Sequence, residues 1–214
     1  QTQADACAVQ DVLQVALSQI AGESLTVASA GRTDAGVHAL AQVVHFDTQV
    51  QRPESAWVRG VNALLPTSVA VRWARQVAPD FHARFSATAR TYRYILCNQP
   101  IRPGVFHKAV GWYYKTLDVM RMQEASQYLL GEHDFSAFRG SGCQAQHAIR
   151  TIHHLTVVKR GRLIIIEVKA NAFLLHMVRN IVGVLMEIGE GEKNPQWAKE
   201  VLESRNRQKA SVTS

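Results

Sequence analysis

Residues 152–170 read IHHLTVVKRGRLIIIEVKA, two runs of apolar and β-branched residues separated by Arg160-Gly161. The runs Ile152–Lys159 and Leu163–Ala170 are typical of strands, and the short glycine-containing connection predicts a β-hairpin. The chain continues into Phe173–Ile188, whose apolar residues predict a buried helix. A hairpin followed by a helix is the second part of a split β-α-β motif.

The segment before this hairpin supplies the first part of the motif. Tyr92–Cys97 predicts a strand. Helical spacing of apolar residues predicts a helix that includes Leu117, Met120, Ala125, Tyr128 and Leu129. The second half therefore runs strand, helix, strand, strand, helix, and a shorter helix is expected over Pro195–Leu202.

The first half of the chain repeats this order without an opening strand. Helices are expected over residues 4–20, ended by Gly22, and over Pro53–Leu64, and strands over Leu25–Ala28, Leu40–Thr48 and Val69–Val77. The predicted fold class is α+β, with two split β-α-β halves, residues 1–84 and 85–214, in one continuous and mainly antiparallel sheet. We expect helices on the outer faces and a basic active-site cleft between the halves.

Both halves lack a strand that the motif requires. One strand would precede residue 4 and the other would follow residue 204. We therefore expect the sequence to be incomplete at both ends, which leaves open whether this piece is active by itself.

The run Ser29-Ala30-Gly31-Arg32-Thr33-Asp34-Ala35-Gly36-Val37-His38 sets one acid among small residues between two glycines. Gly31 and Gly36 allow backbone conformations that are closed to other residues, and the neighbouring alanines leave room for a ligand. Asp34 is therefore a candidate nucleophile or base. From the residues alone, a solvated turn in which Asp34 caps its own backbone is an equal alternative.

Four segments resemble the tRNA pseudouridine synthase A family. They are the Asp34 run with its extension Leu40–Phe46, then Phe81–Tyr94, Leu130–Arg139 and Ala172–Asn180, in the family's order and spacing. Because they are spread over most of the chain, the resemblance favours a catalytic role for Asp34.

The resemblance implies an isomerase that converts uridine to pseudouridine in the anticodon stem-loop of tRNA, at nucleotides 38 to 40. This isomerisation involves no redox change and no external group, so we expect no cofactor. The resemblance also implies a homodimer in which both subunits reach one tRNA. In the family, a closing strand at the C-terminus lends an apolar residue to the substrate pocket.

Composition agrees with a nucleic-acid partner. The chain has 214 residues, 47% of them hydrophobic, with a net charge of +7 and an isoelectric point near 9.6. This charge favours polyanions, among them nucleic acids, acidic membrane surfaces and acidic proteins. We find no apolar run of membrane-spanning length and no charged-then-apolar leader, so we expect no membrane association and no export.

The cysteines and histidines indicate reduced thiols and no metal site. Cys7, Cys97 and Cys143 are odd in number and far apart, as expected for a cytoplasmic protein. The nine histidines show no ligand spacing of a known metal motif.

Arg179 is a charge inside the strongly apolar helix expected over Phe173–Ile188. A buried charge requires a partner, because removing its water costs several kcal/mol. We expect Arg179 to pair with Asp34 and keep it ionised, as the family resemblance also implies. The alternatives are that its long stem reaches solvent or that it meets a structural acid such as Glu167.

Tyr92 and Arg32 are candidate substrate contacts. Strand alternation sends Tyr92 and Tyr94 to one face and Arg93 to the other. An aromatic ring beside arginines can stack on a splayed base, and the resemblance implies that Tyr92 stacks on the target uracil and helps to remove the C5 proton. Arg32 is the candidate wedge that fills the space of the flipped uridine; a plain phosphate contact is its alternative.

Basic residues elsewhere are candidate phosphate contacts, although each one alone is typical of a solvated surface. The candidates are Arg84, Arg90, Arg93, Arg139, Arg150, Lys159, Arg160 and Arg162.

Two rival functions are weighed against the isomerase. A non-catalytic RNA-binding module of this sheet type would carry aromatic residues on the central strands and would not need a buried acid and arginine. The loop from Gly31 to His38 and Arg179 therefore count against this function. A phosphotransferase with Asp34 as nucleophile requires a second acid or Mg²⁺ ligands near it, and the residues around Asp34 offer none.

Overall fold

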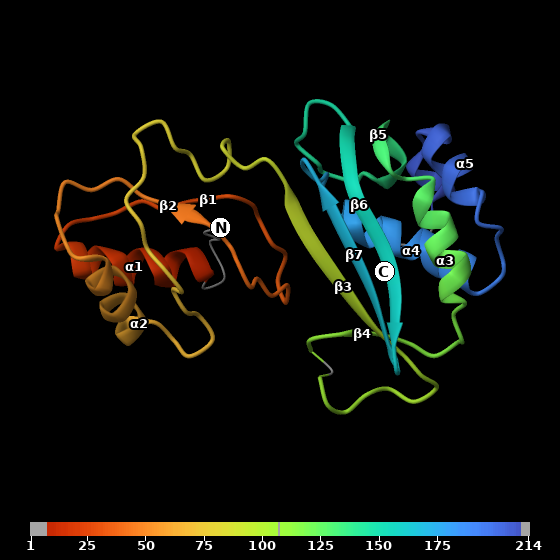
Figure 1. Ribbon diagram of the computed structural model, residues 1–214, viewed down its shortest axis with the longest axis horizontal. Helices are drawn as coiled ribbons and strands as arrows, with labels where there is room; N and C mark the ends of the chain where they lie inside the picture. The colour runs from red at the N-terminus through yellow and green to blue at the C-terminus, as the bar shows by residue number, and fades with distance from the viewer. Residues whose placement is uncertain (1–7, 107, 211–214) are drawn as a thin grey trace. The chain divides into compact units, whose positions relative to one another are not determined.

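The computed structural model describes residues 8–106 and 108–210 (Figure 1). The chain divides into two compact units, Gln1–Ala87 and Thr88–Ser214, close to the division that the sequence predicts after residue 84. Helices and mainly antiparallel strands make up the chain, so the predicted α+β class is confirmed. Each unit has its own hydrophobic core.

Helix α1 of the first unit, Val9–Ala21, ends where the sequence predicts. Gly22 takes the left-handed conformation (φ 78°), and its N–H donates to the Ser18 carbonyl at 2.8 Å. A side chain at this φ is strained, so glycine is the residue that ends a helix here most easily. The buried face of α1 includes Leu13 and Leu17.

The predicted helix over Pro53–Leu64 is present with one irregular turn. A π-helical turn, η1 (Ala56–Gly60), leads into α2 (Val61–Leu64). Gly60 lies against α1, because a Cβ at this position would stand 2.8 Å from Ile20 Cδ1. A side chain at position 60 would therefore displace the end of the Ile20 side chain, and glycine lets the two helices pack without this change.

Strands of the first unit are shorter than predicted. Strand β1 (Ala28–Ser29) pairs antiparallel with β2 (Val44–His45), and the described residues of Val69–Val77 form no strand. The prediction of a strand over Val69–Val77 is therefore wrong.

Side-chain amides explain these short strands. The backbone N–H of Val71 donates to Asn62 Oδ1 at 2.7 Å, and its carbonyl accepts from Asn62 Nδ2 at 2.8 Å. Val27 likewise donates to Gln14 Oε1 and accepts from Gln10 Nε2, both at 3.0 Å. Backbone groups satisfied in this way have no need of a neighbouring strand.

The second unit contains a five-stranded sheet in the order β4-β3-β7-β6-β5. Its strands are β3 (Arg90–Asn98), β4 (Gly111–Tyr113), β5 (Gly131–Asp134), β6 (Ile149–Arg160) and β7 (Leu163–Ala170). All neighbours are antiparallel except β3 and β4. The predicted hairpin is confirmed, and the two short edge strands were not predicted.

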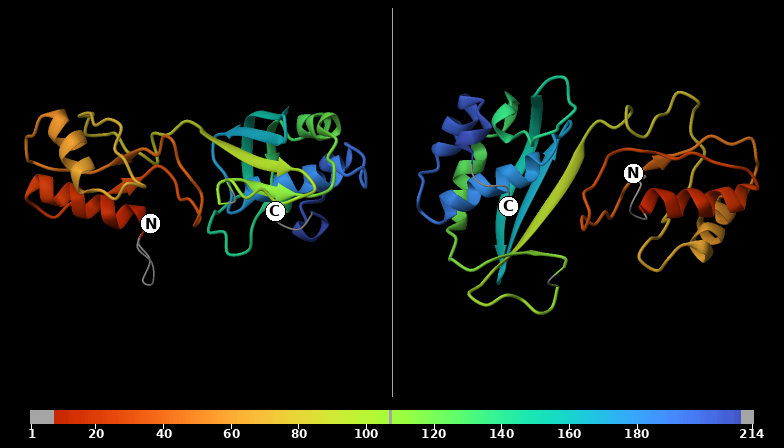
Figure 2. Two further views of the ribbon diagram at one scale, coloured as in Figure 1. Left: turned by 90° about the horizontal axis from the view of Figure 1, so that it is seen from below. Right: turned by 180° about the vertical axis from the view of Figure 1, so that it is seen from behind.

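Two helices cover one face of this sheet (Figure 2). They are α3 (Val119–Gln127) and α4 (Met177–Gly189), and α5 (Trp197–Ser204) packs beside them. Helix α4 begins later than the sequence predicts, because His176 takes a left-handed conformation (φ 57°) and interrupts the helical path. Beneath the helices, the core of the sheet is formed by fully buried residues such as Ile164, Ile166 and Val168.

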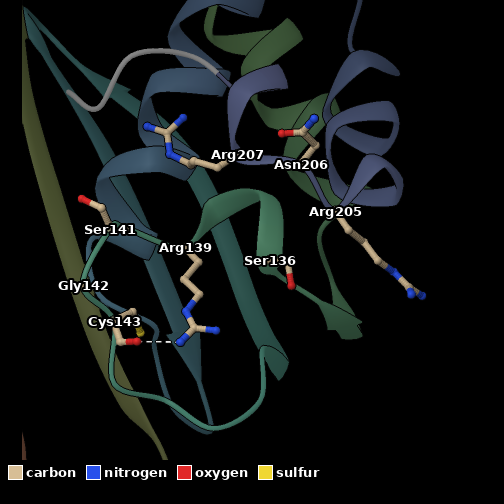
Figure 3. A pocket seen from close by; sticks show the side chains of 9 residues that line it. Ser136, Arg139, Ser141, Gly142, Cys143, Arg205, Asn206 and Arg207 are labelled. Carbon is tan, nitrogen blue, oxygen red and sulfur yellow. Dashed lines mark hydrogen bonds between the residues drawn. The ribbon is translucent and has the colours of Figure 1, made fainter.

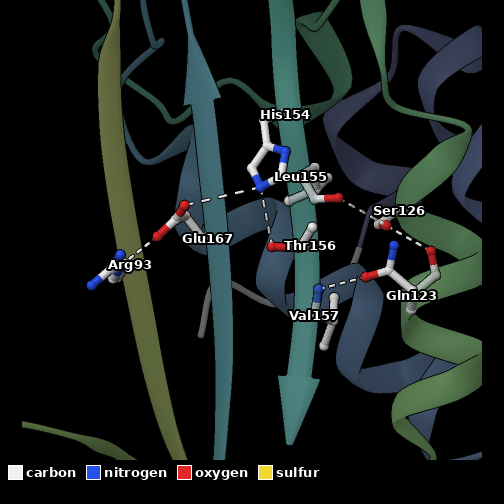
Figure 4. Close-up of polar contacts among 8 residues, drawn as sticks. All are labelled: Arg93, Gln123, Ser126, His154, Leu155, Thr156, Val157 and Glu167. Carbon is white, nitrogen blue, oxygen red and sulfur yellow. Dashed lines mark hydrogen bonds and ion pairs between the residues drawn. The ribbon is translucent and has the colours of Figure 1, made fainter.

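The opposite face of the sheet is polar at its centre (Figure 4). Arg93 Nε donates to the Glu167 carboxylate, and His154 Nε2 lies 3.9 Å from Glu167 Oε1. On the helix side, α3 bonds to strand β6, where Gln123 Oε1 accepts from the Val157 N–H at 2.6 Å. The sheet therefore has an apolar face under helices and a charged face away from them.

Parts of the predicted fold fall outside the described residues. The missing opening strand would precede residue 4, and the structure does not describe residues 1–7. The missing closing strand would follow residue 204; residues 205–210 contain the short helix η3 (Arg207–Lys209) and no strand, and residues 211–214 are not described. The described strands form two sheets, one in each unit. One continuous sheet and a cleft between the halves stay predictions.

The end of α4 is tied to the edge strand β4 by Glu190. The carboxylate of Glu190 accepts hydrogen bonds from the Tyr113 hydroxyl and from Lys115 Nζ. Burial raises the pKa of Tyr113 to about 12, together with its bond to Glu190. Burial alone would raise the pKa of Glu190, but the bonds from Lys115 and Tyr113 outweigh it and lower this pKa.

We expect Glu190→Gln to reduce the free energy of unfolding by about 1–3 kcal/mol at neutral pH, because two hydrogen bonds lose their charged acceptor. A carboxyl whose folded-state pKa is lowered stabilises the fold above its unfolded pKa of about 4.3. That contribution is lost as the pH falls through the folded-state pKa, so the variant and the wild type should converge in acid. Urea denaturation of the variant and the wild type at neutral and acid pH measures the loss of stability and the convergence in acid.

Glu192→Gln is the matched control. Glu192 is 61% exposed and lies 3.6 Å from the same Lys115 Nζ, so its loss should change stability by less than about 0.5 kcal/mol. Equal destabilisation by the two variants would contradict the role assigned to Glu190.

Candidate active site

Asp34 lies in the loop that joins β1 to β2. Two hydrogen bonds hold the base of this loop, from the Ala30 N–H to the Val43 carbonyl at 2.9 Å and from Gln42 Nε2 to the Gly31 carbonyl at 2.6 Å. The Val37 N–H donates to the Asp34 carbonyl at 3.1 Å and closes a turn around the acid. Residues 32–42 are exposed, so the loop presents Asp34 and Arg32 to solvent.

Only one of the two glycines in this loop needs its conformational freedom. Gly36 has a φ of +80°, which other residues rarely adopt. Gly31 does not lie in the left-handed region, and a Cβ added to it would meet no atom within 4 Å. The expectation for Gly36 is confirmed, and the expectation for Gly31 is wrong.

Tyr92 faces the helix side of strand β3. Its ring meets the Phe173 ring edge-on, with centroids 5.0 Å apart and planes at 89°. Both residues are half-buried against the core of the second unit. Arg93 points to the other face and pairs with Glu167, so the predicted alternation along β3 is confirmed.

Arg179 lies in the first turn of α4. It is half-buried instead of fully buried, which corrects the expectation from the apolar sequence around it. Glu167, the structural acid considered as its alternative partner, faces the side of the sheet away from the helices and pairs with Arg93 and His154. The pairing of Arg179 with Asp34 joins two units that are described separately, so it stays a prediction.

The start of α4 is held by polar contacts that the sequence did not single out. Asn180 is fully buried, and its Nδ2 donates to the Phe138 carbonyl at 2.8 Å. Arg207 Nη2 donates to Asn180 Oδ1 at 3.0 Å. The Gly140 N–H donates to the Leu175 carbonyl at 2.8 Å. A buried asparagine in an apolar helix was the available signal, because such an amide needs internal partners.

A pocket of about 560 Å³ adjoins this region (Figure 3). It is lined by Ser136, Arg139, Gly140, Ser141, Gly142, Cys143, Arg205, Asn206 and Arg207. Arg139 Nη2 donates to the carbonyls of Cys143 and Ala145, at 2.6 and 2.8 Å, and so orders the loop that forms one wall. In Figure 3 the Arg205 side chain points away from Arg139, so the pocket does not gather its arginines on one point.

Cys143 has a perturbed thiol in this wall. Burial by itself would raise the pKa of Cys143. Hydrogen bonds from the Leu175 and Ala145 N–H groups and from Arg139 outweigh burial and lower the pKa. The thiolate is thus better stabilised here than in water.

The basic residues that are candidates for RNA contacts differ in the contacts that they make within the protein. Arg84 lies over the exposed Phe85 ring, 5.8 Å from its centroid, and Arg90 Nη1 donates to the Asn171 carbonyl at 2.9 Å. Arg93 is paired with Glu167, although 63% of its side chain is exposed. Phosphate contacts by Arg84, Arg90, Arg93 and Arg139 stay predictions.

Arg150 is not a surface charge. It is only 8% exposed, and its Nη1 donates to the carbonyls of His147 and Ile149 at 3.1 and 2.6 Å. The expectation of a phosphate contact from Arg150 is wrong, because its guanidinium is enclosed by protein.

Within residues 8–106 and 108–210, no group of three or more His, Cys, Asp or Glu side chains is arranged to hold a metal ion. In the same part of the chain, we find no helix with the length and apolar character needed to cross a membrane.

Comparison with known proteins identifies the class of enzyme. Residues 1–86 and 125–214 match the family model of tRNA pseudouridine synthase. The chain therefore belongs to the tRNA pseudouridine synthase family, and it is a pseudouridine synthase, an isomerase.

Its curated relatives narrow the family. The chain is 54% identical over 205 residues to tRNA pseudouridine synthase A of Coxiella burnetii, covering 96% of this chain and 78% of the relative. It is 54% identical over 206 residues to the protein of that name from Pseudomonas aeruginosa, covering 96% and 72%. The relative from Haemophilus ducreyi is 51% identical over 214 residues, covering 100% and 82%. The resemblance to the tRNA pseudouridine synthase A family, which the sequence motifs indicate, is confirmed.

We expect Asn180→Ala to lower the free energy of unfolding by roughly 1–3 kcal/mol, because Arg207 and the Phe138 carbonyl lose a buried partner. It should also lower the rate constant of catalysis, since Arg179 directly precedes Asn180 in the same turn of α4. Urea denaturation and single-turnover assays measure the two effects.

Gln127→Ala, a change at an exposed amide in α3, is the control and should leave both quantities near the wild type. An Asn180→Ala protein with wild-type stability would show that the buried amide does not hold α4.

Proposed function

We propose that this protein isomerises uridine to pseudouridine in the anticodon arm of tRNA, with the carboxylate of Asp34 as the catalytic nucleophile and without a cofactor. The observation that carries the proposal is the family match over residues 1–86 and 125–214, because these segments include both Asp34 and Arg179. The exposed loop around Asp34, closed by the Gly36 turn, supports it. The relatives' names include tRNA.

The reaction defines what the residues must do. The bond from ribose C1′ to N1 of uracil breaks, the base turns, and C1′ bonds to C5. The proton on C5 leaves and N1 gains a proton, so the atoms balance. The carboxylate of Asp34 can attack C1′, attack C6 of the ring, or relay a proton from C2′. All three routes require an ionised carboxylate that reaches a uridine turned out of its stack.

Arg179 and Tyr92 complete the proposed site. Arg179 would pair with Asp34 and favour its ionised form. Tyr92 would stack on the target uracil and assist removal of the C5 proton. Its edge-on contact with Phe173 supports this, because the packed neighbour fixes the ring's orientation.

Arg32 would fill the gap that the flipped uridine leaves. It is exposed and lies in the same loop as Asp34, so one loop carries both the acid and the wedge. Phosphate contacts from Arg84, Arg90, Arg93 and Arg139 would add to affinity, and the net charge of +7 supports binding of a polyanion. We further propose that the enzyme acts in the cytoplasm as a homodimer in which both subunits reach one tRNA.

A passive RNA-binding module is the weaker alternative. Such modules stack bases on aromatic residues at the open face of the sheet. Tyr92 and Tyr94 of strand β3 lie instead on the helix side of the sheet, so neither of them is on the open face. The open face at this place carries the charged pair Arg93 and Glu167.

We expect Asp34→Asn to abolish pseudouridine formation while tRNA affinity stays within a few-fold of the wild type. The amide keeps the size and hydrogen bonding of the acid but removes the charge that attacks or relays. Release of tritium from C5 of labelled uridine in tRNA measures the rate, and filter binding measures affinity. A rate above about a thousandth of the wild type would rule out Asp34 as the essential group.

We expect Arg179→Met to lower the rate of pseudouridine formation. Without the guanidinium, Asp34 would lose its counter-charge and the contact that holds it in place. Methionine keeps the packing of the side-chain stem. Asp34→Asn combined with Arg179→Met should be more stable than Arg179→Met alone. A wild-type rate in Arg179→Met would show that the pair does not exist.

A further inference from the structure

The loop between β3 and β4 exposes a group of large apolar side chains. The side chains of Ile101, Val105 and Phe106 are 80%, 72% and 71% exposed. Trp112 and Tyr114, which follow the loop, are 41% and 56% exposed. Single exposed apolar residues are common, but a group of this kind marks an interaction surface. We call residues 99–106 and 108–110 the Phe106 loop, and Figure 1 shows it extending from the end of the sheet.

Phe106 has an unfavourable backbone conformation as well as an exposed ring. Its φ is +65°, a region that bulky residues rarely adopt. The N–H groups of Ala109 and Val110 donate to its carbonyl, at 2.8 and 3.2 Å, and hold it there. Glycine would relieve this strain. An aromatic ring kept at such a position in solvent points to a function that the ring itself performs.

The root of the Phe106 loop is fixed to the sheet. Trp112 Nε1 donates to the Gln99 carbonyl at 2.9 Å, and the Gln99 N–H donates to the Tyr113 carbonyl at 3.2 Å. Arg162, in the turn between β6 and β7, donates to Gln99 Oε1 at 3.2 Å. The exposed rings therefore stand on a base held by three strands, which lowers the entropy lost on binding.

The charge of this segment has one sign. Residues 99–116 contain Arg102, Lys108 and Lys115 and no aspartate or glutamate. Lys115 pairs with Glu190. Arg102 and Lys108 are exposed, and neither forms an ion pair with a described acid. Aromatic rings among cations that lack acidic partners are the features that bind single-stranded nucleic acid.

We propose that the Phe106 loop binds an unpaired part of the tRNA, with the Phe106 ring stacked on a base and with Arg102 and Lys108 beside the flanking phosphates. The proposal rests on the proposed function, since it assumes a tRNA substrate. The loop follows the end of β3 at Asn98, and Tyr92 lies six residues earlier on that strand. At roughly 3.3 Å per residue the two are about 20 Å apart, so the loop contacts nucleotides other than the target uridine.

The test removes the ring without harming the fold. Phe106→Gly takes away the side chain at a backbone position that glycine prefers, so its thermal unfolding temperature should equal or exceed that of the wild type. Its affinity for an unmodified tRNA transcript, measured by filter binding, should fall roughly 5- to 150-fold, the range expected for the loss of one base–aromatic stack.

Two variants control for the ring. Phe106→Trp keeps an aromatic surface and should keep the wild-type affinity. Met120→Ala shortens a side chain in α3 that is 77% exposed, and it should bind tRNA as the wild type does.

The contribution of Arg102 and Lys108 is measured separately, by the salt dependence of tRNA affinity. Arg102→Gln combined with Lys108→Gln should lower the slope of log affinity against log salt by roughly 1.4, at about 0.7 for each contact to a single strand. Lys199→Gln removes a charge from α5, where Lys199 pairs with Glu203, and should leave this slope unchanged. A smaller slope in the control as well would show that only net charge matters and would overturn the proposal.

The outcomes separate the two proposals. If the wild type forms pseudouridine and Phe106→Gly binds tRNA like the wild type, the loop proposal fails and the proposed function stands. If Phe106→Gly weakens tRNA binding but the wild type forms no pseudouridine, the loop proposal stands and the proposed function fails. If Phe106→Gly changes the oligomeric state and leaves tRNA affinity unchanged, the loop is a contact between subunits and the proposal is overturned.

Discussion

The amide of Asn180 is the interaction on which the arrangement of the second unit depends. It is fully buried, donates to the Phe138 carbonyl and accepts from Arg207. It thereby joins the start of α4 to the turn after β5 and to the chain after α5. A buried amide with two fixed partners tolerates little displacement, because any shift leaves a polar group unpaired. Arg179 is the neighbour of Asn180 in the same turn, so its backbone is fixed as well. The buried contacts of Asn180 thereby determine where the candidate catalytic charge lies.

In the first unit, side-chain amides bond to the backbone of extended segments and replace strand pairing there. Asn62 satisfies the backbone of Val71, and Gln10 and Gln14 satisfy the backbone of Val27. These bonds take the place of a strand ladder, so the segments around β1 and β2 run extended with little sheet pairing. The Asp34 loop, between β1 and β2, is thus supported by a small core and by local bonds. We regard this as suited to a loop that must meet a large and variable ligand.

The sequence pattern predicted correctly those elements that are stabilised by interactions between residues close in the sequence. The hairpin of β6 and β7 and the end of α1 at Gly22 follow from alternation and from glycine chemistry. The strand over Val69–Val77 was wrong, because alternation gives no sign that Asn62 would take its hydrogen bonds. The burial of Arg150 was missed because its partners are the backbone carbonyls of His147 and Ile149, and every residue carries a carbonyl whatever its side chain. Asp34 was preferred as the candidate nucleophile only because four motifs occur together, since its own loop resembles an ordinary turn.

Strand β3 connects the candidate chemistry to the proposed recognition surface. Tyr92, near its start, packs edge-on against Phe173, and the Phe106 loop begins where the strand ends. Between them β3 pairs along its length with β7, so the distance between the two places cannot change without breaking a continuous ladder. This fixed spacing would select the substrate, because only an RNA whose target uridine and unpaired nucleotides stand at the same separation would engage both places. Specificity would then come from the shape of the tRNA, and a short uridine-containing strand would be a poor substrate even though it fits the chemistry.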